Sequence, residues 1–130
     1  MSTEAAVRLR GLSKTYVTGV PWSRRRVEAL KPLDLDVPRG GVFGLLGLNG
    51  AGKTTTVKLI LGLLRPGSGS CEVLGGSISD RAVRRRVGYL PELPYFSRQL
   101  TGEEILRYFG RLHGLSGAAL TRRVGETLET

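Results

Sequence analysis

Apolar and polar side chains alternate in two segments near the N-terminus, residues 5–12 and 28–37. A period of two is typical of a strand with one buried and one solvated face, so we expect two antiparallel strands. Asp34 and Asp36 alternate with leucines, which places both carboxylates on the solvated face. Residues 17–26 lie between the two segments and contain a glycine, a proline and three consecutive arginines. This composition predicts an exposed loop.

A different pattern starts at residue 42. Residues 42–46 are a continuous apolar run, which predicts a strand that is covered on both faces in a parallel sheet. A glycine-rich turn follows, and residues 54–64 then carry apolar side chains at spacings of three and four. We therefore expect an amphipathic helix that Pro66 and Gly67 terminate.

Strand and helix patterns continue to alternate in the rest of the chain. Thr101 and Glu104 have the spacing of a capping box, which marks the start of one of these helices. The alternation predicts an α/β protein. The expected elements are a strand at 71–74, a basic helix at 80–86, a buried strand at 87–90, a loop forced by Pro91 and Pro94, and helices that begin near 101 and near 118.

The turn between the apolar run and the first helix reads GLNGAGKTT over residues 47–55 and satisfies the pattern G-x-x-x-x-G-K-[ST]. Its glycines let backbone N–H groups surround a polyphosphate, and the positive end of the following helix points to the same place. Lys53 can reach the β- and γ-phosphate oxygens, and the Thr54 hydroxyl is a hard oxygen ligand that suits Mg²⁺. Thr55 can hydrogen-bond the α-phosphate. The motif therefore predicts that ATP and Mg²⁺ bind here.

Composition narrows the class of protein. The chain is about 40% hydrophobic and 24% charged, which is ordinary for a globular domain and argues against disorder. It has no apolar stretch of the ~20 residues that span a bilayer and no signal-peptide pattern at its N-terminus, so we expect a cytoplasmic chain. A single cysteine, Cys71, cannot form an internal disulfide and is interpreted as a small strand residue. The net charge of +9 favours anionic ligands, but its short arginine runs are more typical of a solvated face.

The P-loop sequence GLNGAGKTT resembles that of ATP-binding cassette transporters more closely than that of kinases, GTPases or helicases. The stretches LRGLSKTY and ALKPLDLDVPRGGVFGLLG also resemble the segments that lead to the loop in this family. The resemblance implies that Tyr16 stacks on adenine, although the residue alone would be interpreted as ordinary packing. The loop at residues 17–26 is longer than is usual in the family. The implied nucleotide-binding residues are Tyr16, Asn49, Gly50, Ala51, Gly52, Lys53, Thr54 and Thr55.

The next landmark of the family is a glutamine that contacts Mg²⁺ and the attacking water. In the similar stretch VGYLPELPYF this position is occupied by Glu92. The resemblance implies a metal site of Thr54 and Glu92, since a carboxylate is also a magnesium ligand; an ordinary surface role for Glu92 stays open. Gln99 follows seven residues later and receives no role. The stretch LTGEEILRYFGRLHGL resembles the start of the helical subdomain in exporter-type subunits.

Motifs that a full family member carries are missing, although the resemblance covers almost all of the chain. Residues 115–119 match the LSGGQ signature only superficially, no apolar run ends in Asp-Glu, and His113 does not follow such a run. The resemblance implies an α/β fold with a P-loop NTPase-type core and an antiparallel β subdomain over residues 1–95, and the start of a helical subdomain over 96–130. It also implies truncation, because full members are nearly twice as long. No catalytic residue is assigned apart from Glu92 at the position of the family's glutamine.

The family implies an ATP-binding subunit that couples Mg-ATP hydrolysis to transport through a transmembrane permease. Such a subunit pairs head to tail with a second ATP-binding subunit, on the inner face of the cell membrane. We expect the 130-residue chain alone to fold poorly and to be inactive as an ATPase. Two alternatives stay open: a cassette ATPase that acts on ribosomes or nucleic acid, and a non-catalytic fragment. We do not expect nucleic acid to be a partner of this chain.

Overall fold

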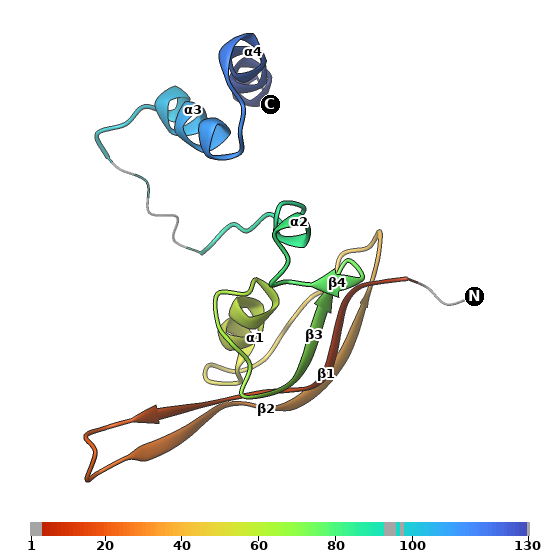
Figure 1. Ribbon diagram of the computed structural model, residues 1–130, viewed down its shortest axis with the longest axis vertical. Coiled ribbons are helices and arrows are strands. Elements are labelled where there is room, and N and C mark those ends of the chain that lie inside the picture. Colours follow the sequence, from red (N-terminus) through yellow and green to blue (C-terminus); the bar gives the residue numbers. More distant parts are fainter. Residues whose placement is uncertain (1–3, 93–95, 97, 130) are drawn as a thin grey trace. The chain divides into compact units, whose positions relative to one another are not determined.

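An antiparallel sheet forms the centre of the first of two units in this chain, Met1–Tyr89 and Leu90–Thr130. The computed structural model describes residues 4–92, 96 and 98–129. The four strands are ordered β2-β1-β3-β4 (Figure 1). The elements of this unit are β1 (Ala5–Thr18), β2 (Arg25–Pro38), α1 (Lys53–Ile60), β3 (Ser68–Val73), β4 (Gly76–Ser77) and α2 (Arg81–Arg84).

The alternating pattern of the two N-terminal segments is confirmed. Asp34 and Asp36 are exposed on β2, and the leucines beside them are partly buried. Asp36 accepts a hydrogen bond of 2.7 Å from the Arg10 guanidinium on the neighbouring strand. That hydrogen bond holds the pKa of the Asp36 carboxyl below its usual value. The two aspartates are therefore surface groups of the sheet, as predicted.

The core of this unit forms where α1 packs against one face of the sheet. Its buried members are Leu9, Leu12, Leu30 and Leu59. Leu9 and Leu12 are three positions apart in one strand, which would place them on opposite faces of a regular sheet. A register shift between them lets both side chains reach the same core. Cys71 packs against this core as a partly buried strand residue, and burial raises the pKa of its thiol.

The predicted loop at residues 17–26 is shorter than expected. β1 and β2 continue to pair as far as Thr18 and Arg25, so only residues 19–24 connect them. All residues from 17 to 26 are exposed, as the sequence predicted. Residues 17, 18, 25 and 26 therefore belong to a long hairpin rather than to a loop.

Two predicted strands are not present. Residues 42–46 and 87–90 have no regular secondary structure, and Val42, Leu46 and Leu90 are exposed. The prediction for residues 42–46 assumed parallel neighbours, and any buried strand needs neighbours that supply its hydrogen bonds and its cover. Among the described residues every strand pair is antiparallel. The apolar runs therefore have no partner here, and the prediction of two buried strands is wrong for this structure.

Helix α1 ends earlier than predicted. It stops at Ile60, because the chain turns at Gly62 and the backbone N–H groups of Leu63 and Leu64 both donate to the Lys58 carbonyl. Pro66 and Gly67 therefore follow the end of the helix rather than cause it. The predicted strand near residue 71 and basic helix near residue 80 are present as β3 and the short α2.

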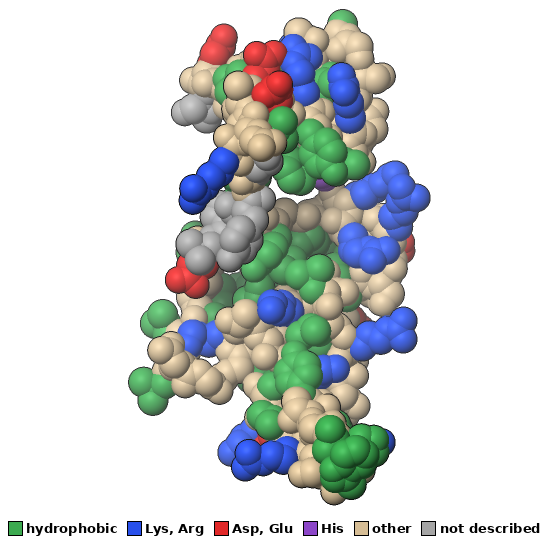
Figure 2. All heavy atoms as spheres, turned by 90° about the vertical axis from the view of Figure 1, so that its left-hand side faces the viewer, with side chains coloured by type: hydrophobic (Ala, Val, Ile, Leu, Met, Phe, Trp, Pro, Cys, Tyr) green, Lys and Arg blue, Asp and Glu red, His purple; other side chains and the backbone are tan. Residues whose placement is uncertain are grey.

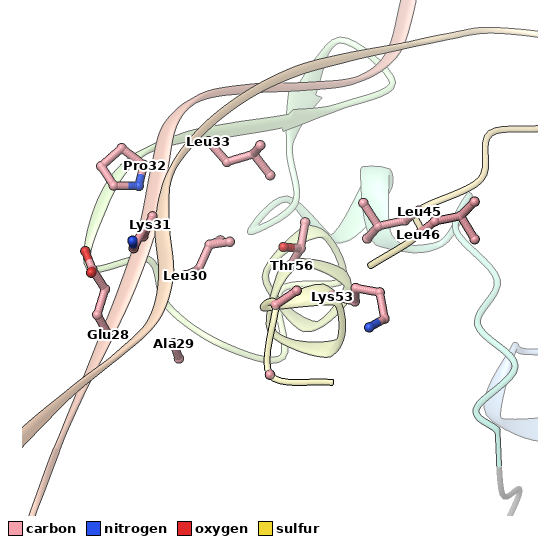
Figure 3. Close-up of a pocket in the computed structure, with 12 residues that line it drawn as sticks. Glu28, Ala29, Leu30, Lys31, Pro32, Leu33, Leu45, Leu46, Lys53 and Thr56 are labelled. Carbon is pink, nitrogen blue, oxygen red and sulfur yellow. The ribbon is translucent and has the colours of Figure 1, made fainter. Parts of the chain in front are cut away.

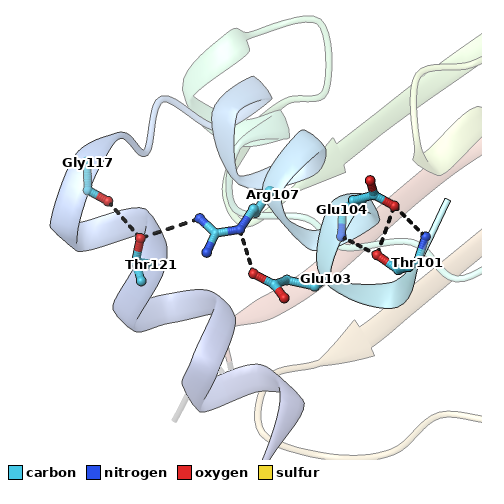
Figure 4. A network of polar contacts seen from close by, with 6 residues as sticks. All are labelled: Thr101, Glu103, Glu104, Arg107, Gly117 and Thr121. Atoms are coloured by element: carbon cyan, nitrogen blue, oxygen red, sulfur yellow. Dashed lines mark hydrogen bonds and ion pairs between the residues drawn. The ribbon is translucent and has the colours of Figure 1, made fainter.

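The second unit is a pair of helices, α3 (Gly102–Leu112) and α4 (Gly117–Leu128). Thr101 and Glu104 form the predicted capping box, in which the Thr101 backbone N–H donates to the Glu104 carboxylate over 2.8 Å (Figure 4). Arg107 donates to Glu103 within α3 and to Thr121 of α4, and the second hydrogen bond links the two helices. Leu120 and Val124 are the buried residues of α4 and form its apolar face. The His113 ring is hydrogen-bonded to the Phe109 carbonyl of its own helix over 2.9 Å.

Within the part of the chain that the structure describes, no helix is both long enough and apolar enough to cross a bilayer.

Candidate phosphate-binding site

The loop at residues 47–55 has the backbone that a phosphate cradle requires. Gly50 and Gly52 have φ angles of 85° and 86°, a left-handed conformation that disfavours other residues. The Ala51 N–H closes a turn onto the Leu48 carbonyl over 3.1 Å. α1 then begins at Lys53 with no side-chain cap among the described residues. The N–H groups of its first turn are therefore available to an anion.

Gly52, at the end of this loop, packs closely against β2. A Cβ on Gly52 would lie 2.8 Å from the Ala29 carbonyl oxygen and 3.1 Å from a methyl group of Leu30. Leu30 is buried in the core with Leu59 of α1. Thr56, also buried, donates its hydroxyl hydrogen to the Gly52 carbonyl over 2.9 Å. The start of α1 is therefore held against a strand that lies more than twenty residues earlier in the chain.

Lys53 folds back into the loop. Its ammonium donates to the carbonyls of Gly47 and Leu48 over 2.6 and 2.7 Å. Figure 3 shows the side chain leaving α1 on the side away from β2. These carbonyls hold the charge at the centre of the turn, which is the place where the motif predicts a polyphosphate.

A pocket of about 350 Å³ lies beside the loop (Figure 3). Gly50, Ala51, Lys53 and Thr56 line it from the loop and α1. Leu45 and Leu46 from the apolar run also line it, and Figure 3 shows them on the other side of α1 from β2. Residues 28–33 of β2 form a further wall. Sequence reasoning did not assign this wall to the site. No motif marks it, because its residues contribute through the position of the strand.

The remaining predicted residues lie in different places. Thr54 is exposed in the first turn of α1, and Thr55 is partly buried beside it. Asn49 is exposed in the turn. Tyr16 is partly buried on β1 opposite Val27, with the Lys14 ammonium 5.5 Å from its ring centroid, and it does not line the pocket.

Glu92 is exposed in the second unit. Of the predicted nucleotide-binding residues, Gly50, Ala51 and Lys53 line one pocket. The binding roles of the loop residues, Tyr16 and Glu92 stay predictions. Part of the predicted loop around Pro94 lies outside the described residues.

The donor set fits Mg²⁺ held jointly with a nucleotide. Among the described residues no group of three His, Cys, Asp or Glu side chains could hold a metal ion. The exposed Thr54 hydroxyl is a hard oxygen ligand at the start of α1. In P-loop proteins the hydroxyl of this threonine shares Mg²⁺ with phosphate oxygens and a carboxylate. Thr54 can therefore supply one ligand from this unit, and the phosphates would supply others.

Comparisons with known proteins show which family the chain resembles. The model of the family described as "ABC transporter" matches residues 30–130. An uncharacterized ABC transporter ATP-binding protein of Synechocystis sp. is 48% identical over 113 residues, which are 87% of this chain and 32% of that protein. The Nod factor export ATP-binding protein I of Cupriavidus pinatubonensis is 44% identical over 127 residues, which are 96% of this chain and 37% of that protein.

A solved structure gives the same result at the level of the fold. It is described as the ATP binding subunit of an ABC transporter, and it superposes with a TM-score of 0.65 at 36% sequence identity. The match covers 87% of this chain and 45% of the solved chain. The present chain thus spans about a third of the length of the two curated relatives and less than half of the solved subunit.

Proposed function

The chain belongs to the ABC transporter family, and from this premise we propose that residues 47–55 bind the phosphates of ATP together with Mg²⁺. The observation that carries the proposal is the geometry of the loop. Two glycines with left-handed backbones lead into the first turn of α1, and the Lys53 ammonium lies within the turn. N–H groups and a cation that converge on one place form a site for a polyphosphate.

Each side chain of the loop has a separate task in this proposal. The Lys53 ammonium exchanges the carbonyls of Gly47 and Leu48 for β- and γ-phosphate oxygens. Its charge is already at the loop, so little ordering is required on binding. Thr54 holds Mg²⁺, which neutralises phosphate charge when it is bound. The Thr55 hydroxyl donates to the α-phosphate.

Hydrolysis requires more than a phosphate cradle. Phosphoryl transfer also needs a positioned water and charge stabilisation around the transferred group. We assign a supporting role to Glu92, whose carboxylate has the chemistry to contact the metal and orient water. The signature, the second metal-binding strand and its following glutamate are missing from this sequence. The proposal is therefore that the family's ATPase activity needs further residues, and that this chain alone binds ATP without turnover.

The role in transport extends this proposal. We propose that the complete protein pairs head to tail with a second ATP-binding subunit and couples hydrolysis to a transmembrane permease. It would act at the inner face of the cell membrane. The relative named for Nod factor export supports an exporter rather than an importer.

The test is to measure binding and turnover on the same preparation of the 130-residue chain. We expect saturable binding of a fluorescent ATP analogue in the presence of Mg²⁺, weaker binding in EDTA because Thr54 then has no metal to hold, and no phosphate release above background. A chain that binds no nucleotide under either condition contradicts the proposed site. Phosphate release that depends on Lys53 would show that the missing motifs are not required.

Tyr16 provides a separate prediction about the adenine ring. If Tyr16 stacks on the base, Tyr16→Ala should weaken ATP binding by about 1 to 3 kcal/mol, because base–aromatic stacking contributes that much per base. Tyr16→Phe is the matched control and should bind almost as well as wild type, since the ring rather than the hydroxyl makes the contact. Titration with the fluorescent ATP analogue measures the affinities of wild type and the two variants. If all three are equal, Tyr16 does not contact the base and has only a packing role.

A further inference from the structure

The hairpin of β1 and β2 extends beyond the rest of its sheet. β3 pairs with β1 no further than Ser13 opposite Ser68, whereas β1 and β2 continue to Thr18 opposite Arg25. Among the described residues the last part of β1 is therefore paired with β2 alone, as a two-stranded ribbon (Figure 1). We call residues 17–27 the hairpin tip. All of its residues are exposed.

A tight turn presents a tryptophan at the end of this ribbon. The Ser23 N–H donates to the Val20 carbonyl over 2.8 Å, which closes a turn with Pro21 and Trp22 at its centre. A Cβ on Gly19 would collide with the Ser23 carbonyl oxygen, and Gly19 has a φ of 101°. The turn therefore depends on a glycine at this position. It leaves Trp22 85% exposed, with the apolar side chains of Val17, Val20 and Val27 also exposed nearby in the tip.

Positive charge surrounds this apolar end. The hairpin tip contains Arg24, Arg25 and Arg26 and no acidic residue, and no ion pair involves these arginines within the described residues. Successive strand residues point to opposite faces, so Arg25 and Arg26 lie on the two faces of the ribbon. Figure 2 shows hydrophobic side chains beside Lys and Arg side chains at the lower end of the view, where this hairpin ends.

We propose that the hairpin tip binds end-on to the surface of a membrane that contains anionic lipids. The Trp22 indole has an apolar body and a polar N–H, which suits the interface between headgroups and acyl chains. Arginines on both faces of the ribbon reach anionic headgroups around the inserted tip. The charge of the tip is complementary to such a surface, and no ion pair within the described residues neutralises it. This inference does not depend on ATP binding, because it concerns residues outside the loop and its pocket.

The chemistry of the tip favours lipid over nucleic acid. Single-stranded nucleic acid binds where several aromatic rings stack on successive bases along a basic groove. The tip offers one aromatic ring among valines, and aliphatic side chains gain most from an apolar phase. A membrane interface is therefore the partner that uses the valines, the indole and the arginines together.

Intrinsic fluorescence of the full 130-residue chain tests the proposal, because Trp22 is its only tryptophan. We expect phosphatidylcholine vesicles with 30% phosphatidylglycerol to shift the emission to shorter wavelength, and pure phosphatidylcholine vesicles to cause little shift. Added NaCl should weaken binding, because salt screens headgroup attraction. An unchanged spectrum with anionic vesicles would overturn the proposal. A shift with RNA but not with vesicles would also overturn it, in favour of a nucleic-acid surface.

Two triple variants separate a local effect from total charge. Replacing Arg24, Arg25 and Arg26 by Gln should weaken vesicle partitioning about a hundredfold, at about fivefold for each arginine near an anionic surface. The matched control replaces Arg84, Arg85 and Arg86 by Gln, which removes the same charge elsewhere and should have a much smaller effect. Both variants keep Trp22, and circular dichroism checks that both keep the wild-type fold. Equal losses in the two variants would overturn a specific role for the tip.

Removing the indole provides an independent measurement. Trp22→Ala should reduce co-sedimentation with anionic vesicles about tenfold, because the inserted apolar area is lost while the arginines stay. The tip is exposed, so this substitution should leave the fold intact. Co-sedimentation equal to that of wild type would show that the tip does not enter the interface, and the proposal would then be wrong.

Discussion

Replacing Lys53 by alanine should weaken Mg-ATP binding about a hundredfold or more, which is about 3 kcal/mol or more. The ammonium lies within the turn through bonds of 2.6 and 2.7 Å to the carbonyls of Gly47 and Leu48. A nucleotide replaces these neutral acceptors by charged phosphate oxygens, and each charge-assisted hydrogen bond contributes about 1.5 to 3 kcal/mol. Titration with a fluorescent ATP analogue measures the loss directly.

Lys58→Ala is the matched control for this substitution. Lys58 lies on the same helix, is exposed, and carries the same charge, so its removal changes the general attraction for an anion without touching the loop. We expect at most a severalfold change, because an exposed charge outside the site is screened. If the two variants lose affinity equally, the contribution of Lys53 is general electrostatic attraction, and the loop is not the phosphate site.

Replacing Gly52 by alanine should affect stability and nucleotide binding together. A left-handed backbone costs a residue with a Cβ about 1 to 2 kcal/mol. In addition, the new Cβ would lie 2.8 Å from the Ala29 carbonyl oxygen and 3.1 Å from Leu30, so α1 must move away from β2. We expect a total loss of about 2 to 4 kcal/mol in the free energy of unfolding, within the range of substitutions that combine strain and collision. Urea denaturation without nucleotide measures it.

Gly40→Ala separates the two causes. Gly40 also has a positive φ, 77°, but a Cβ there would meet nothing within 4 Å. It should therefore cost only the conformational part, about 1 to 2 kcal/mol, and leave ATP affinity close to that of wild type. If Gly52→Ala is no more destabilising than Gly40→Ala, and binds ATP normally, the contact between the loop and β2 does not position the first turn of α1.

The sequence predicted those features whose causes are local. The pattern at residues 47–55 predicted a glycine turn that leads into a helix, because the residues that make this turn are neighbours in the sequence. The capping box of Thr101 and Glu104 is confirmed for the same reason, since both partners lie within one helical turn. The alternation around Asp34 and Asp36 depends only on the geometry of one strand. Family membership also followed from these local motifs.

Other features depended on which segments meet in space. The apolar run at residues 42–46 has the composition of a buried strand, yet a strand exists only where a neighbour supplies hydrogen bonds, and no described strand does so. No sequence pattern predicts the register shift that brings Leu9 and Leu12 to one core. No pattern predicts that β2 lines the pocket beside the loop either. Likewise, only cross-strand pairing showed that residues 17–26 extend a hairpin and expose Trp22 at its end. Sequence thus determined the chemistry of the loop, because that chemistry is local, and tertiary structure decided what supports it, because support comes from residues distant along the chain.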